Sequence, residues 1–239
     1  MESEARSLEP REPSAVSMVR DALKEHIRSH GMMPGDSLPS EGEFAARLGV
    51  SRPVVREAFS SLAALKLIDV GPGRRARIPS LDDTVLARVL EHAVMTQQIS
   101  VQQILDVRRI VEMRTAELAA LRRTEEEAER VAAYARGMRV DLRDAEQVME
   151  HDIAFHEAIA TASRNPMFAL VMGSFHFVTR QTWPVGWAAR RNEEEHLVAV
   201  AVHEAIAKAI VDRDPEAAAT HMAAHFDITA RALLAAGIT

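Results

Sequence analysis

The chain has 239 residues, of which 47% are hydrophobic and 27% are charged, with a formal net charge of -6 and no cysteine. This length accommodates one small domain and a larger domain with its own core, while the lack of cysteine excludes disulfides and thiolate catalysis. No apolar run approaches the ~18 residues that cross a bilayer, and the start, MESEARSLEPREP, is acidic and unlike a secretion signal. We therefore expect a cytoplasmic protein without a membrane segment.

The charge is divided unevenly along the chain. Residues 14–80 carry 10 Lys+Arg against 7 Asp+Glu, whereas residues 81–239 carry 17 against 24. Only the amino-terminal part has the sign that suits a polyanion such as DNA. The larger part is therefore expected to have a different task.

The first 13 residues are polar and lack periodicity, which predicts a disordered tail. Apolar residues then recur at helical spacing from Val16 to Ile27, and Gly31 with Pro34-Gly35 ends that helix. The next stretch, Leu38 to Leu62, reads as two short helices joined by a tight turn at Gly49. This pattern is typical of a helix-turn-helix.

Each of the two short helices has its own start signal. Ser40 and Glu43 form a capping box for the first helix, and Ser51 caps the second. Arg52 and Arg56 lie four residues apart, so both project from one side of the second helix near its amino terminus, where an anion is favoured. The alternative is a solvated pair of arginines on an ordinary bundle helix.

The segment after these helices predicts a wing. Residues 65–70 lead into GPGRRARI, where a Pro72-Gly73 turn would join two short strands ending at Ile78. We therefore expect a winged helix-turn-helix over residues 14–78. Its predicted DNA-binding residues are two arginines that contact bases or phosphates and four residues that position the backbone and wing: Arg52, Arg56, Ser40, Ser51, Gly73 and Arg74.

The run PGDSLPSEGEFAARLGVSRPVVREAF resembles the DNA-binding domain of the GntR family of bacterial transcription regulators. The resemblance covers about Val16 to Ile78 and rests on the LPSE, GVSR and VREA strings together. Two positions depart from the family pattern. Gly42 stands where members usually carry a DNA-contacting arginine, and the usual Gly-Arg-Gly of the wing is Gly73-Arg74-Arg75 here. The resemblance thus implies the mode of DNA binding more than the operator sequence.

Residues 79–81 read as a short linker, and Asp82 or Asp83 caps the next helix. From there to residue 239 the period is helical almost throughout, which predicts an all-α bundle of about seven helices and no sheet. Trp183 to Trp187 interrupts the pattern and is predicted to be a loop. The remaining helix starts are expected at Ser100, Thr124, Asp144, Asn165, about Arg191, and Asp214.

The segment HDIAFHEAI suggests a metal site. Asp152 and His156 are one helical turn apart, so both can bind one divalent ion, although a hydrogen-bonded pair is the simpler reading. His203 and His225 lie on apolar faces of two later helices and could complete the site, while His221 could replace His225 by spacing alone. One Asp and three His suit zinc most, with nickel, manganese or iron as alternatives.

The VRRIVEMRTAELAA, DIAFHEAIATASRNP, HEAIAKAI and DPEAAATHMAAH segments resemble the all-helical FCD ligand-binding domain of the FadR subgroup of GntR regulators. In its metal-binding members the ligands fall on Asp152, His156, His203 and His225. The family arginine that points at the bound ligand falls on Arg108, which would otherwise be read as a helix-surface ion pair with Glu112. Arg180 is a second, weaker candidate for binding the effector.

The sequence therefore predicts a DNA-binding regulator, a repressor, that acts as a homodimer on a palindromic operator and responds to a small carboxylate bound at the metal site. It is not expected to be an enzyme. The alternative is a metal-dependent hydrolase or isomerase fused to a DNA-binding module. Such an enzyme needs a base beside the metal, and helical spacing turns the near candidates, Glu150 and Glu157, away from Asp152 and His156. A purely structural metal is a third possibility.

Overall fold

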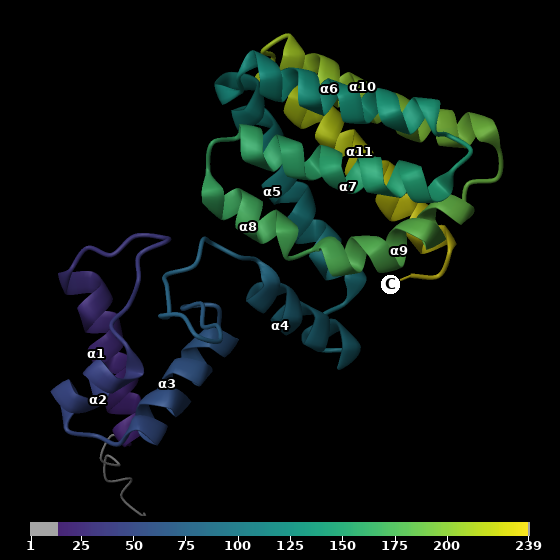
Figure 1. Cartoon of the computed structure of the whole chain (residues 1–239). Coiled ribbons are helices and arrows are strands. Elements are labelled where there is room, and N and C mark those ends of the chain that lie inside the picture. The colour runs from purple at the N-terminus through teal and green to yellow at the C-terminus, as the bar shows by residue number, and fades with distance from the viewer. Residues whose placement is uncertain (1–13, 239) are drawn as a thin grey trace, which may run out of the picture. The chain divides into compact units, whose positions relative to one another are not determined.

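The computed structural model describes residues 14–238, so the tail predicted for residues 1–13 lies outside the described part of the chain. Within residues 14–238 the regular elements are eleven helices, shown in Figure 1. The chain divides between Asp82 and Asp83 into two compact units, and each unit is described by itself. No helix in the described range is both long and apolar enough to span a bilayer.

The amino-terminal unit contains α1 (Ala15–Ser29), α2 (Glu41–Leu48) and α3 (Arg52–Ala64). The capping box predicted for α2 is confirmed: the Glu43 amide donates to Ser40 Oγ at 3.2 Å, and the Ser40 amide donates to Glu43 Oε2 at 2.6 Å. Gly49 ends α2 in the left-handed region at φ 66°, as the predicted tight turn requires. The buried core of this unit includes Val19, Leu23, Leu38, Phe44, Val55 and Phe59.

Two details of this unit differ from the prediction. Ser51 precedes α3, but its side chain makes no capping hydrogen bond, and Pro53 removes one of the amides that such a cap would use. The predicted wing strands are reduced to isolated bridges that Arg77 makes with Asp69 and with Ser37. The Gly71-Pro72-Gly73 turn and Pro79 leave few residues that could extend a ladder.

The carboxy-terminal unit holds the remaining eight helices: α4 (Thr84–Met95), α5 (Val101–Arg122), α6 (Glu125–Val140), α7 (Ala145–Ala162), α8 (Pro166–Gly173), α9 (His176–Ala188), α10 (Glu193–Val211) and α11 (Pro215–Ala235). The helix caps predicted at five positions are confirmed, because each side chain accepts a hydrogen bond from the first turn of its helix: Ser100, Thr124, Asp144, Asn165 and Asp214.

The loop predicted at Trp183 to Trp187 is wrong, because α9 runs through these residues with Pro184 inside it. This helix is also the one by which the structure exceeds the predicted seven. Trp183 stacks on Trp187 with ring centroids 4.8 Å apart, and Gly186 lies so close to Leu233 that an added Cβ would be 3.3 Å from it. Tertiary packing therefore maintains a helix that local sequence disfavours.

The long helices α5, α6, α7, α10 and α11 pack side by side around the main core (Figure 1). Phe155 and Ile159 of α7 are 0% and 1% exposed, and they pack in one cluster with Ile206, Ile210 and Met222. Thus the helix that carries Asp152 and His156 is fixed by its apolar face, as its spacing predicted.

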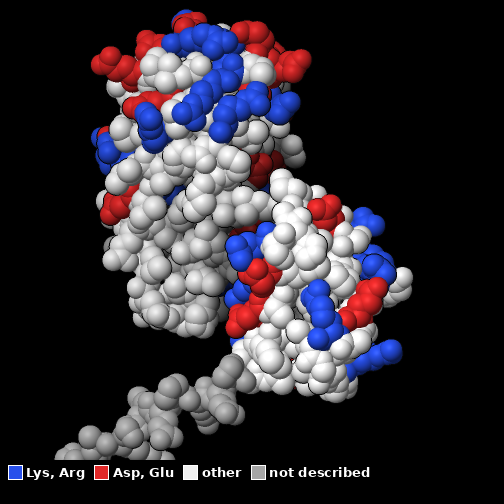
Figure 2. All heavy atoms as spheres, turned by 90° about the vertical axis from the view of Figure 1, so that its left-hand side faces the viewer, with Lys and Arg blue, Asp and Glu red and all other residues white. Residues whose placement is uncertain are grey.

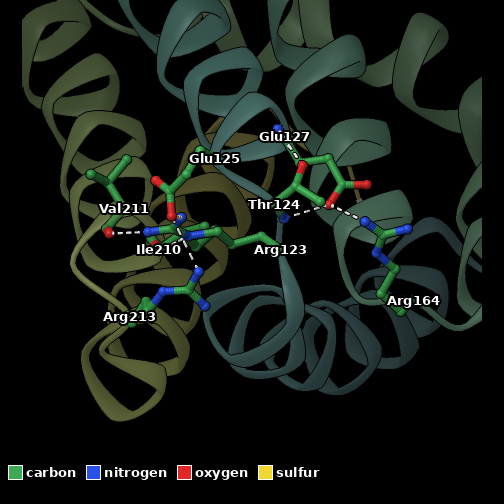
Figure 3. A network of polar contacts seen from close by, with 8 residues as sticks. All are labelled: Arg123, Thr124, Glu125, Glu127, Arg164, Ile210, Val211 and Arg213. Atoms are coloured by element: carbon green, nitrogen blue, oxygen red, sulfur yellow. Dashed lines mark hydrogen bonds and ion pairs between the residues drawn. The ribbon is translucent and has the colours of Figure 1, made fainter.

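A polar network ties the corner between α5 and α6 to the end of α10 (Figure 3). Arg123, 5% exposed, donates from Nη2 to Val211 O at 2.5 Å and from Nε to Ile210 O at 3.4 Å. Arg123 and Arg213 both pair with Glu125. A guanidinium therefore satisfies the last carbonyls of the helix that carries His203.

Candidate metal centre and nucleic-acid interface

In the amino-terminal unit, one groove collects five of the six predicted DNA-binding residues. Its lining includes Ser40, Arg52, Arg56, Gly73 and Arg74. Ser51 is not part of this lining, whereas the neighbouring wing residue Arg75 is. The first turn of α2, the start of α3 and the wing thus converge on one cationic surface.

The groove arginines are held loosely. Arg56 lies 3.3 Å from Glu41, Arg74 lies 2.8 Å from Asp69, and both arginine side chains are at least 46% exposed. Figure 2 likewise shows lysine and arginine side chains beside acidic ones on the smaller unit. Exposed pairs of this kind contribute little stability, so a phosphate can replace the carboxylate partner. Arg52 has no ion pair within residues 14–238.

The Arg52 side chain lies beside Gly42. A Cβ added at Gly42 would be 3.5 Å from Arg52 Nη2, an ordinary contact distance. Arg52 is also the first residue of α3, where the helix dipole favours an anion. Arg52 therefore occupies the surface next to the family position at which this chain lacks an arginine.

In the carboxy-terminal unit, α7, α10 and α11 bring Asp152, His156, His203 and His225 together, each 5–8% exposed. Nitrogen atoms of the three imidazoles lie within 4.8 Å of one another. Asp152 Oδ1 lies 2.9 Å from His203 Nε2 and 4.0 Å from His156 Nε2. His221, the alternative by spacing, is outside this cluster and only half-buried.

The donor set fits a divalent metal. His203 Nδ1 lies 2.9 Å from Ala199 O, which places the proton of a neutral ring on Nδ1 and leaves a lone pair on Nε2, facing the Asp152 carboxylate. The Nε2 atoms of His156 and His203 are buried without a hydrogen-bond partner of normal geometry among the described residues. A cation between these lone pairs and the carboxylate would satisfy all of them.

The pKa values of the cluster have opposing causes. Burial acts to raise the pKa of Asp152, but the close contact with His203 and the charges of the nearby imidazoles hold that pKa well below its ordinary value. Burial and the neighbouring rings lower the pKa of His225 and keep it neutral. Asp152 is therefore an anion and His225 a free base, the forms in which both bind metals.

Glu112 of α5 is a buried member of the site, whereas the sequence indicated it only as a surface partner of Arg108. It is 1% exposed; its Oε1 accepts from Arg108 Nε at 2.9 Å, and its Oε2 lies against His156 Nδ1. A carboxylate on Nδ1 leaves Nε2 of His156 free for a metal. The periodic apolar stripe of α5, which includes Leu105, Ala116 and Ala119, could have placed Glu112 on the buried face.

A cavity of about 60 Å³ opens beside the cluster. Arg108, Asp152, His203 and His225 line it from one direction, and its lining also contains the aromatic residues Trp183, Trp187 and Phe226. The alternative reading of Arg108 as an ion pair with Glu112 is right about the pair but wrong about the surface, because Arg108 is 7% exposed. Arg108 also donates from Nη1 to Thr179 Oγ1 at 2.8 Å. The lining therefore combines charged and metal-binding types of side chain with aromatic rings.

The structure does not place Arg180, the second predicted effector residue, in this cavity. Its side chain is 49% exposed and pairs with Glu150 on the surface, and it is absent from the lining. Arg190, which follows α9, lines the cavity instead. No sequence pattern singles out Arg190, because the helix before it was expected to be interrupted by a loop.

A helix-turn-helix domain followed by an all-helical domain with a buried polar cavity defines the class of ligand-responsive transcription regulators. Two family models match the chain: bacterial regulatory proteins of the gntR family over residues 15–78, and the FCD domain over residues 103–228. The chain belongs to the GntR family of bacterial regulators, in the FadR subgroup with an FCD domain. It is a DNA-binding transcription regulator with an effector-binding domain.

Named relatives agree with this assignment. The chain is 34% identical over 146 residues to the HTH-type transcriptional regulator LutR of Bacillus subtilis, covering 61% of this chain and 67% of LutR. It is 28% identical to the HTH-type transcriptional repressor NanR of Cronobacter sakazakii, and the match covers 86% of this chain and 81% of NanR. The solved structure of Streptococcus agalactiae GntR is similar, with a TM-score of 0.63 and 25% sequence identity. The match covers 90% of this chain and 99% of that structure.

Proposed function

We propose that this regulator is a repressor that binds a palindromic operator as a homodimer and releases it when a small carboxylate binds at a metal centre in the FCD domain. The observation that carries this proposal is the cluster of four buried metal-ligating side chains that opens on a cavity with Arg108. The name of the NanR relatives supports the sign of regulation, since they are called repressors.

In this proposal Asp152, His156, His203 and His225 hold one divalent ion, most suitably zinc, with nickel, manganese or iron as alternatives. The bound ion would supply coordination positions for the oxygen atoms of an effector. Arg108 provides a guanidinium on the same cavity wall, which matches a carboxylate in shape and charge. Glu112 holds both Arg108 and His156 in place.

On DNA, Arg52 and Arg56 contact base edges or phosphates in the major groove, while Ser40, Ser51, Gly73 and Arg74 position the backbone and wing. The convergence of five of these six residues on one groove supports this assignment. A single recognition helix reads few base pairs, so two copies on a palindromic site are proposed. Because the target is chromosomal DNA of a bacterium, we place the protein in the cytoplasm.

We propose that the effector is bound and not chemically changed. The two candidate bases near Asp152 and His156 are otherwise engaged: Glu150 pairs with Arg180, and Glu157 lies 3.1 Å from His176. Glu112 is held between Arg108 and His156. Metal-loaded protein should therefore not hydrolyse carboxylate esters or amides, and turnover of such a substrate would favour the enzyme alternative.

The test begins with an operator selected from random duplexes and titrated with the full chain while fluorescence anisotropy is recorded. Metal-loaded and metal-stripped proteins are then compared with lactate, citrate, other hydroxy acids, dicarboxylates and sugar acids. We expect an acid that releases DNA from the metal-loaded protein alone. Metal should be lost from His156→Ala and His225→Ala but retained by His221→Ala, and full occupancy in the first two variants would remove this site.

A further inference from the structure

The two arginines that line the cavity have different partners. Arg108 is neutralised within the protein, because Glu112 accepts from its Nε at 2.9 Å and Thr179 from its Nη1 at 2.8 Å. Arg190 has no carboxylate within ion-pair distance in the described part of the chain. Its polar contact is a single hydrogen bond, from Nη1 to Gly186 O at 2.7 Å.

Arg190 is nevertheless placed to bind a ligand. It is half-buried, and the central carbon of its guanidinium lies 5.5 Å from the centroid of the Trp187 ring. A guanidinium has five N–H donors, so the bond to Gly186 leaves most of them without a protein acceptor. Burial lowers the pKa of Arg190, against the opposing charges of Asp152 and Glu195. A cation in this environment lacks an anion that would compensate its desolvation.

The charges around the cavity favour a ligand with two negative groups. The charges of Arg108 and Glu112, which form an ion pair, sum to zero. Arg190 and Asp152 form no ion pair, but they also contribute one charge of each sign to the cavity. The three imidazoles bind a metal as neutral bases. A divalent ion would therefore give the cavity a net charge of two positive units, which a doubly charged anion would balance.

We propose that the effector is a dicarboxylic acid, with one carboxylate at the metal ligands and Arg108 and the second carboxylate bound by Arg190, whose guanidinium lies beside Trp187. This inference rests on the proposed function and narrows its effector class. The simpler role of Arg190 is to cap the end of α9 through Gly186 O. That role uses one donor and predicts no preference among ligands, so binding experiments separate the two roles.

The experiment uses zinc-loaded full-length protein and isothermal titration with malonate, succinate, glutarate and adipate. Each acid is paired with its half-amide, which keeps the size and replaces one carboxylate with an uncharged amide. We expect the tightest dicarboxylate to bind about 10- to 100-fold more tightly than its half-amide, the range for a charge-assisted hydrogen-bonded pair. Arg190→Gln should abolish this preference, and Arg190→Lys should retain part of it.

Arg191→Gln is the matched control, because the adjacent arginine is 86% exposed, pairs with Glu195 and does not line the cavity. It should keep the full preference. Equal binding of a dicarboxylate and its half-amide to the wild type overturns the inference without any variant, and so does an unchanged preference in a folded, zinc-loaded Arg190→Gln protein.

Monocarboxylates separate this inference from the proposed function. If acetate, lactate or another monocarboxylate binds and releases DNA while no dicarboxylate does, the dicarboxylate inference fails and the proposed function stands. If neither class binds protein that holds zinc, both fail.

Discussion

Gly42 and Gly49 stand at opposite ends of α2 and differ in what they require of the backbone. Gly49 has φ 66°, a conformation that costs an L-residue about 1–2 kcal/mol. Gly42 lies within the first turn, and a Cβ there would meet Arg52 at an ordinary 3.5 Å. We expect Gly49→Ala to lower the free energy of unfolding by about 1 kcal/mol and Gly42→Ala to raise it by about 0.5 kcal/mol. Scanning calorimetry of the full chain measures both, and equal effects would contradict this account.

Arg56 is the residue on which operator affinity should depend most directly. Arg56→Ala should weaken operator binding by about 1–3 kcal/mol if the guanidinium makes a bidentate contact with guanine. Arg28→Ala is a suitable control, because Arg28 of α1 is equally exposed, pairs with Glu25 and lies outside the groove. Anisotropy titrations at one salt concentration provide the comparison. Equal losses in the two variants would indicate a general charge effect.

Glu112 should affect the metal without ligating it. Glu112→Gln removes the charge that faces His156 and Arg108 while keeping the shape of the side chain, so we expect metal affinity to fall about 10- to 100-fold. Glu117→Gln, on the same helix but paired with Arg114 at the surface, should leave affinity unchanged. Competition with a chromogenic chelator measures both, and wild-type affinity in Glu112→Gln would reduce this residue to a packing role.

Among single residues, the sequence identified those whose roles follow from their spacing. Asp152 and His156 are one turn apart, and the spacing alone predicted that they could point to a common atom. The partners Glu112 and Arg190 depend on contacts between α5 and α7 and on the course of the chain after α9, neither of which a local pattern contains. Arg180 was chosen because it lies on a neighbouring predicted helix, but its side chain is 49% exposed and pairs with Glu150 at the surface.

Among the elements, helix starts were predictable because a cap is a local interaction. Ser40, Ser100 and Thr124 each form a capping box with a residue three positions later. The continuity of α9 was not predictable, since it depends on Trp187 stacking between Trp183 and His196, at 4.8 and 4.1 Å. The wing was predicted to have two strands, but the structure has only isolated bridges there. The few residues around Pro72 cannot sustain a ladder of β-sheet hydrogen bonds.

The end of α10 offers a test of how one side chain stabilises an element. Arg123→Met keeps an apolar stem but removes the donors that satisfy the carbonyls of Ile210 and Val211. We expect a loss of about 2–3 kcal/mol in the free energy of unfolding, measured by urea denaturation. Arg130→Met, at an exposed position of α6, should change stability by less than about 0.5 kcal/mol. Similar losses in both variants would deny the capping role.

In the whole molecule, regulation requires that the DNA-free and DNA-bound forms bind the effector with unequal affinity. An effector changes operator binding only if it binds the DNA-free and DNA-bound forms differently, and we expect a coupling of about 1–3 kcal/mol. By reciprocity, operator DNA should weaken effector binding by the same factor. Titrating the effector with and without saturating operator measures this factor, and equal affinities would show that the FCD domain does not control DNA binding.

The order of the candidate ligands along the chain has a consequence for synthesis. Asp152 and His156 lie in α7, His203 in α10 and His225 in α11. Domains generally fold in turn from the amino terminus as the ribosome makes them. The site can therefore close only after α11 has been made, long after the helix-turn-helix has emerged. Each newly made chain acquires its DNA-binding surface before it acquires its sensor.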